Sequence, residues 1–126
     1  MNAERYKLLV QPESVYSEEK SDLAADVYAF GYTIRITNLG AEPAQLVSRH
    51  WIITDANDQV QEVRGLGVVG EQPWIEPGSQ YEYSSMTSLK TPFGSMRGRY
   101  QIVSQDGTRF DAEIPEMVLV ARRVLH

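Results

Sequence analysis

Three glycines form the part of this sequence whose spacing is closest to a chemical motif. Gly65, Gly67 and Gly70 are spaced like the loop that cradles the pyrophosphate of a dinucleotide. That loop works only between a strand and a helix, because the amides at the helix N-terminus bind the phosphates. A strand is expected over residues 58–65, but Pro73 and Pro77 would break any helix behind the glycines. We therefore do not predict a dinucleotide site.

Two interpretations of this glycine-rich loop remain open. Successive amides in such a loop can form an anion-binding nest without a helix, and Arg64 would add positive charge beside it. The loop would then hold a pyrophosphate, a nucleotide or a dinucleoside polyphosphate. Alternatively, the glycines adopt positive φ angles and pack closely against the edge of a sheet. We favour the packed loop, because glycines are common wherever chains turn tightly.

Further candidate binding residues lie on both sides of the loop in the sequence. Trp74 stands in a loop between prolines, where it is either an anchor for a partner or a side chain folded over the end of the domain. Arg49, His50 and Arg64 are expected to flank the same surface. His50 lies in a strand without a neighbouring ligand, so we interpret it as a packed or hydrogen-bonded side chain.

Patterns for metal binding and catalysis are weak. The chain has no cysteine, and its other histidine, His126, is the last residue. Asp55 and Asp58 resemble a calcium loop only in part, since the glycine and the closing glutamate are missing, and a hairpin turn is expected there. The sequence contains no nucleophile elbow. We predict no metal site, no cofactor and no enzymatic activity.

The elements that must position these residues follow a period of two. Residues 28–36, 97–102 and 109–114 alternate apolar side chains with small or polar ones, which is typical of half-buried strands. Residues 43–55 are apolar on both faces, so we expect a strand in the middle of a sheet, with Trp51 in the core. Asp106-Gly107 is a strong hairpin signal, and residues 17–26 are expected to form a short turn or an exposed loop. About seven or eight strands predict an all-β, antiparallel sandwich of the immunoglobulin or fibronectin type III kind.

Length and composition limit the class of protein. At 126 residues and 14.3 kDa, the chain fits a single domain over residues 1–126. The net charge of −5 argues against nucleic acid as a partner. No stretch has the length of a membrane span, and the N-terminus lacks the apolar core of a signal peptide. We expect a soluble, cytoplasmic protein without membrane contact.

Several stretches together resemble the ApaG family, whose domain is also called DUF525. The most specific is SRHWIITDANDQVQEVRGLGVVGEQP, residues 48–73, and the others are YAFGYTIRITNLG, EPGSQYEYSS, TPFGSMRGRYQIVSQDG and AEIPEMVL. The resemblance implies an immunoglobulin-like or fibronectin type III-like β-sandwich in a bacterial cytoplasmic protein. It also implies an association with cobalt and magnesium efflux or resistance, and related eukaryotic domains look like protein-binding modules. It implies no reaction, so no catalytic residue is assigned.

Three functions follow as hypotheses. The first is a non-enzymatic protein-binding module that presents the loop from Gly65 to Trp74, with sheet edges that are also open to self-association. The second is a small-molecule sensor that holds a phosphate-bearing ligand in the glycine-rich loop. The third is direct binding of a divalent cation.

Overall fold

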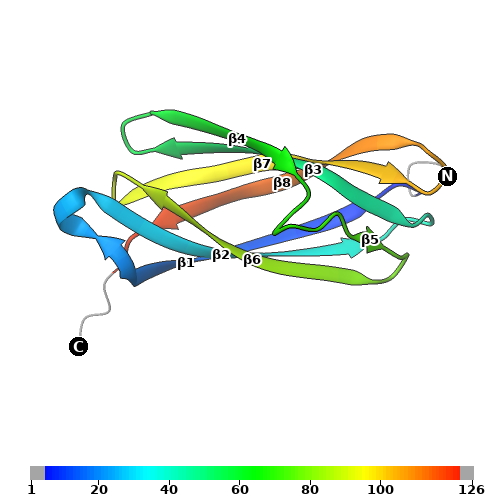
Figure 1. Cartoon of the computed structure of the whole chain (residues 1–126), viewed down its shortest axis with the longest axis horizontal. Helices are drawn as coiled ribbons and strands as arrows, with labels where there is room; N and C mark the ends of the chain where they lie inside the picture. The colour runs from blue at the N-terminus through cyan, green and yellow to red at the C-terminus, as the bar shows by residue number, and fades with distance from the viewer. Residues whose placement is uncertain (1–4, 123–126) are drawn as a thin grey trace.

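The computed structural model describes residues 5–122, which form two packed antiparallel sheets (Figure 1). This part of the chain contains one short 3-10 helix, η2 (Leu23–Ala25), and no helix long and apolar enough to cross a membrane. Its eight strands are β1 (Leu8–Asp22), β2 (Val27–Asn38), β3 (Ala44–Asp55), β4 (Val60–Leu66), β5 (Trp74–Ile75), β6 (Gln80–Leu89), β7 (Phe93–Ser104) and β8 (Arg109–Val120). The predicted antiparallel β-sandwich is confirmed, and its architecture is consistent with an immunoglobulin-like or fibronectin-like fold.

The strand order leaves the two sides of the sandwich unlike each other. One sheet has the order β1-β2-β6, and the other has the order β4-β3-β7-β8, with β5 also paired to β3. On one side the terminal strands β1 and β8 are bridged, since the Ser14 hydroxyl donates to the carbonyl of Val118 at 3.2 Å. On the other side β4 and β6 end their sheets in separate layers (Figure 1). We call this second side the β4–β6 side.

The core follows the period of two that the sequence predicts. In β2, the side chains of Phe30, Tyr32, Ile34 and Ile36 are all buried between the sheets. Trp51 of the opposite sheet is 2% exposed and meets Tyr32 edge-on, with ring centroids 5.6 Å apart. Burying one large apolar side chain stabilises a fold by about 1.5–3 kcal/mol, so this alternation is what holds the two sheets together.

A bulge in β3 explains why residues 44–55 look apolar on both faces. The pairing of β3 with β7 shifts register between Leu46 and Ser48, so one residue is inserted into the strand. Leu46 and Trp51 therefore both face the core, although strict alternation puts them on opposite sides. His50 and Ile52 lie half-buried on the outer face. The central position of the strand is confirmed, because β3 pairs with β4 on one side and β7 on the other.

Residues 17–26 differ from the expected turn or loop. β1 continues as strand to Asp22, with a register shift between Ser17 and Asp22, and η2 follows it. The Ser21 hydroxyl accepts a hydrogen bond from the Ala29 amide and donates to the Ser17 carbonyl, which holds the irregular segment against β2. Most of its other side chains are exposed, which is why the sequence shows no apolar period there.

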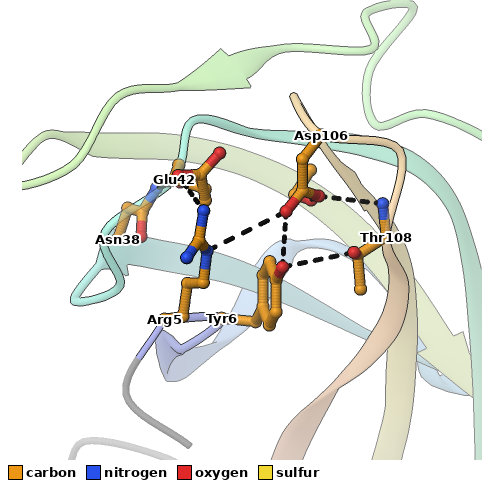
Figure 2. A network of polar contacts seen from close by, with 7 residues as sticks. Arg5, Tyr6, Asn38, Glu42, Asp106 and Thr108 are labelled. Atoms are coloured by element: carbon orange, nitrogen blue, oxygen red, sulfur yellow. Dashed lines mark hydrogen bonds and ion pairs between the residues drawn. The ribbon is translucent and has the colours of Figure 1, made fainter. Parts of the chain in front are cut away.

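A polar network fastens the start of the described chain to two distant turns (Figure 2). Tyr6 donates its hydroxyl proton to Asp106 at 2.5 Å and lies 3.2 Å from the Thr108 hydroxyl, in the predicted β7–β8 hairpin. Arg5 pairs with Glu42 at 3.2 Å, in the connection between β2 and β3. The Asp106 carboxylate also accepts a hydrogen bond from the Ser104 hydroxyl. This bond, followed by those from Tyr6 and the Thr108 amide, holds the pKa of the Asp106 carboxyl well below its ordinary value. We call this network the Asp106 latch.

Candidate functional site

The glycine-rich loop is a tight turn between two short strands. After β4, the Val68 amide donates to the Glu71 carbonyl at 2.8 Å, and the Glu71 amide donates back to the Val68 carbonyl at 2.9 Å. The two residues between them, Val69 and Gly70, have φ angles of 43° and 83°. Positive φ at both central positions is the signature of a type I′ turn. The chain then enters β5 rather than a helix, as expected from the prolines.

Three of the loop amides donate to carbonyls of the protein. The Gly67 amide donates to the Val47 carbonyl at 2.7 Å, and the amides of Val68 and Glu71 bond to each other's carbonyls. Gly67 has a φ of 61°, and a Cβ there would lie 2.1 Å from the Glu71 carbonyl oxygen. Val68 is buried in the core. This geometry has the features of the packed loop, and it leaves these three amides unavailable to a phosphate.

Arg49 fastens the loop from inside the sandwich. Its Nη1 donates to the carbonyl oxygens of Leu66 at 3.1 Å and Gly67 at 2.9 Å. The guanidinium lies directly over Gly65, where a Cβ would be 2.7 Å from Nη1. Gly65 is therefore required by close approach rather than by its φ angle. Arg49 shares the inner face with Trp51, two residues further along β3.

His50 and Arg64 lie on the opposite, outer face of the same sheet. They are cross-strand partners, and Arg99 of β7 continues the row on the other side of His50. Glu62 lies 2.7 Å from His50 Nε2 and 3.6 Å from Arg64, and the hydrogen bond with His50 is the main cause of its lowered pKa. Strand alternation puts the Arg49 side chain on the inner face and those of His50 and Arg64 on the outer face, but all three residues line one depression beside β4.

Trp74 lies in a strand rather than in a loop. It pairs with Gln45 as part of β5, while its neighbour Ile75 enters the core. The Trp74 side chain is 51% exposed, so it is neither fully presented to solvent nor folded away. Gln72, just before it, donates from Nε2 to the Val47 carbonyl at 2.9 Å and keeps the segment close to β3.

The feature that sequence reasoning missed is a cavity on the β4–β6 side. It has a volume of about 380 Å³ and opens between the two sheets, beside the Val69–Gly70 turn. Its lining includes Tyr32, Arg49, Trp51, Val63, Tyr83 and Met86. The alternation of β3 and β6 could have placed Trp51 and Tyr83 on inner faces, but no sequence signal shows that the sheets part here.

Polar groups beneath this cavity are unusual for a sandwich core. The Tyr83 and Tyr100 hydroxyl oxygens lie 2.5 Å apart, and burial raises the pKa of both phenols. The positive charge of Arg49 opposes this effect at each of them. The Nε1–H of Trp51 is buried and has no hydrogen-bond partner within residues 5–122. An unpaired buried donor typically costs about 1–3 kcal/mol.

A second tyrosine of β6 binds the residue that ends the turn. The Tyr81 hydroxyl donates to Glu71 Oε2 at 2.8 Å, which ties the turn to the other sheet. Desolvation, followed by this carboxylate, raises the pKa of Tyr81 to about 12. Figure 1 shows the corresponding path, in which the chain after β4 descends from one layer toward the other.

The carboxylates predicted to form a turn do so. The Asp58 amide donates to the Asp55 carbonyl at 3.1 Å, and Asp55 Oδ1 accepts the amides of Asn57 and Gln59. Within the described residues, no three His, Asp or Glu side chains are grouped so that they could hold a metal ion. His126 lies outside this part of the chain.

Comparisons with known proteins agree with one another over nearly the whole chain. Residues 18–104 match the model of the ApaG domain, DUF525. Protein ApaG of Chromobacterium violaceum is 64% identical over 121 residues, which cover 96% of each chain. Protein ApaG of Dechloromonas aromatica is 57% identical over 122 residues, covering 97% of this chain and 96% of that one. The crystal structure of the putative ApaA protein from Bordetella pertussis superimposes with a TM-score of 0.91 at 50% identity, covering 96% of this chain and 98% of that one.

Proposed function

The chain belongs to the ApaG domain family, and from its geometry we propose that it is a non-enzymatic protein-binding module that accepts an extended segment of its partner along the free edge of β4. The observation that carries the proposal is that β4 has a neighbouring strand on one side only within residues 5–122 and bears exposed apolar side chains at both of its ends. Edge strands pair readily with extended chains, because their outward amides and carbonyls have no partner. The alternating side chains of the added strand then provide specificity.

The hydrogen-bonding register identifies which groups of β4 are free to bind. The Asp55 amide donates to the Gln59 carbonyl, and the Gly67 amide donates to the Val47 carbonyl. Alternate residues of an antiparallel pair bond to the neighbouring strand, so every second residue of β4 between these two bonds faces away from β3. The residues whose backbone groups face the free edge are Val60, Glu62, Arg64 and Leu66.

Apolar side chains stand around this edge. Leu66 is 75% exposed and Val60 is 60% exposed, both on β4, and Val69 is 55% exposed at the tip of the turn. Met86 of β6 is also exposed, but it pairs with Gly31 and lies on the outer face of the other sheet. Scattered exposed apolar residues are ordinary, but a group next to an open edge favours contact with a partner. A partner segment with apolar side chains at alternate positions fits this arrangement.

Backbone strain at Val69 is a second reason to propose this side of the sandwich as the partner-binding site. Val69 is β-branched and has a φ of 43°, a conformation that such residues avoid. Its side chain fills no core position, so packing does not compensate for the strain. Strained residues that persist at exposed positions are typical of binding sites.

Affinity capture with proline variants tests the proposal. Arg64→Pro removes an amide that faces the free edge of β4, without breaking the ladder to β3. Ser84→Pro is the matched control on β6, where the Asn38–Ser79 hydrogen bond and the register make the Ser84 amide face outward. Proteins captured from a bacterial lysate by the wild type and by Ser84→Pro should be lost with Arg64→Pro. Undiminished capture by a folded Arg64→Pro protein would rule out the β4 edge.

The remaining hypotheses receive less support from the geometry. A phosphate sensor needs free loop amides, and three of those in the loop already donate to carbonyls. Direct cation binding lacks a ligand cluster among the described residues. An effect on cobalt or magnesium efflux, which the family resemblance implies, would therefore act through the bound partner.

A further inference from the structure

We propose that the cavity between β4 and β6 is a binding site for a small organic carboxylate with an apolar body. This site differs from the edge of β4, because inner-face side chains of both sheets, such as Trp51, Tyr83 and Met96, form much of its lining. A volume of about 380 Å³ is within the range of small-molecule sites. The ligand would enter beside Val69 and Gly70, which line the cavity at the turn.

The polar lining of the cavity selects for acceptors. None of the described residues that line it is acidic, while Arg49 brings a permanent positive charge. Both of the loop carbonyls held by Arg49 are bound by Nη1, so its Nε and Nη2 protons remain for a ligand. The hydroxyls of Tyr32, Ser85 and Thr87 add further donors. A carboxylate accepts hydrogen bonds from a guanidinium in a planar, paired geometry, which a neutral group does not match.

Trp51 supplies an independent reason to expect a ligand. Its indole lines the cavity, and its buried Nε1–H has no acceptor within residues 5–122. Buried hydrogen-bond donors in native proteins are nearly always paired, so an unpaired one favours an acceptor that does not belong to this chain. A small shift of the indole toward the cavity would let an acceptor oxygen of the ligand complete this hydrogen bond.

The apolar walls define the rest of the ligand. Ile53, Val63 and Met96 line the cavity. The arrangement of Arg49 over Gly65 fixes where the charged end must lie, since the guanidinium cannot move toward β4 without meeting the glycine backbone. The carboxylate therefore lies near Arg49 and the apolar body faces these three side chains.

Titration with phenylacetate tests the proposal, and phenylacetamide is the matched neutral probe. A Trp74→Phe protein leaves Trp51 as the only tryptophan, so its indole N–H resonance and its fluorescence report on the cavity alone. We expect phenylacetate to shift the indole resonance saturably, with a dissociation constant on the order of 1 mM, as suits so small a molecule. Phenylacetamide should bind at least about tenfold more weakly.

Three variants decide the outcome. Arg49→Met should abolish the shift, and Val63→Phe should do so by filling the cavity while it leaves Arg49 in place. Arg99→Met, which removes a positive charge from the outer face, should leave binding unchanged. If Arg49→Met does not fold, the Val63→Phe protein alone tests whether phenylacetate binds in the cavity. No saturable shift in the wild type, equal binding of acid and amide, or binding that survives Val63→Phe would overturn the proposal. Because the probe and its readout are local to Trp51, this result does not depend on whether β4 binds a partner.

Discussion

At the scale of single residues, glycines and one valine decide the shape of the glycine-rich loop. Gly65 leaves room for the Arg49 guanidinium, and Gly67 allows the Glu71 carbonyl to approach. The spacing of these glycines resembles that of a phosphate-binding loop, because that motif is defined by its glycines alone. The partner that each glycine accommodates is a side chain or carbonyl of the protein, and only the folded chain reveals it.

Gly65→Ala should destabilise the protein through its contact with Arg49. The added Cβ would lie 2.7–2.9 Å from three guanidinium atoms, so Arg49 must move and lose its bonds to the loop carbonyls. Because the end of the Arg49 side chain can move aside, the cost comes from the lost hydrogen bonds, about 0.5–1.5 kcal/mol each, which urea unfolding would detect. Gly31→Ala is the control, because a Cβ there meets its neighbours at 3.5 and 3.6 Å. Equal stability of the two variants would contradict this role of Gly65.

Val69→Asn should stabilise the protein by about 1 kcal/mol, because asparagine tolerates positive φ and valine does not. The resulting Asn-Gly pair is the preferred sequence of a type I′ turn. Thermal unfolding would measure the gain, and Val60→Asn, at an exposed β4 position outside the turn, should show none. If the turn contacts the partner, the stabilised variant should also bind it more weakly. A lower unfolding temperature for Val69→Asn would show that the turn is not strained.

At the scale of elements, the sequence predicts strands well where one face is buried and poorly where other forces decide. The alternation in residues 28–36 is confirmed by β2, and the Asp106-Gly107 hairpin joins β7 to β8. A strict period of two does not predict the bulge after Leu46, because a single inserted residue exchanges the two faces of the strand. Residues 17–22 form strand through backbone pairing and the Ser21 hydroxyl, which leave no apolar pattern to recognise.

The Asp106 latch should give the protein a characteristic response to acid. Hydrogen bonds from Ser104, Tyr6 and Thr108 lower the pKa of Asp106 below its ordinary value of 3.8, so folding stabilises the ionised form. The stabilisation is complete above the pKa of the unfolded chain and is lost as the pH falls through the folded value.

Asp106→Asn should therefore lower the urea midpoint at neutral pH, and its difference from the wild type should narrow below about pH 3. Asp111→Asn, which alters an exposed carboxyl of β8, is the control and should change the midpoint little at any pH. A wild type and an Asp106→Asn protein that unfold alike at neutral pH would show that the latch contributes nothing to stability.

At the scale of the whole molecule, the proposed function rests on the difference between the two sides of the sandwich. The β1 and β8 edges are joined by Ser14, whereas the β4 and β6 edges leave a cavity between them. The predicted surface from Gly65 to Trp74 overlaps this open side, but its parts divide between an inner face with Arg49 and an outer face with His50 and Arg64. Periodicity predicts which face a side chain takes within its strand, and it does not predict how far apart the two sheets lie.

Hydrogen exchange of the β4 amides, measured residue by residue with and without the captured partner, tests the central claim most directly. In the free protein, the outward amides of Glu62, Arg64 and Leu66 should exchange quickly, and those of Val63 and Gly65, which face β3, should exchange slowly. Partner binding should protect the three outward amides and leave the rest of the sandwich unchanged. Protection confined to β6 or to the outer face around His50 and Arg99, with Glu62, Arg64 and Leu66 still exchanging quickly, would contradict strand addition at β4.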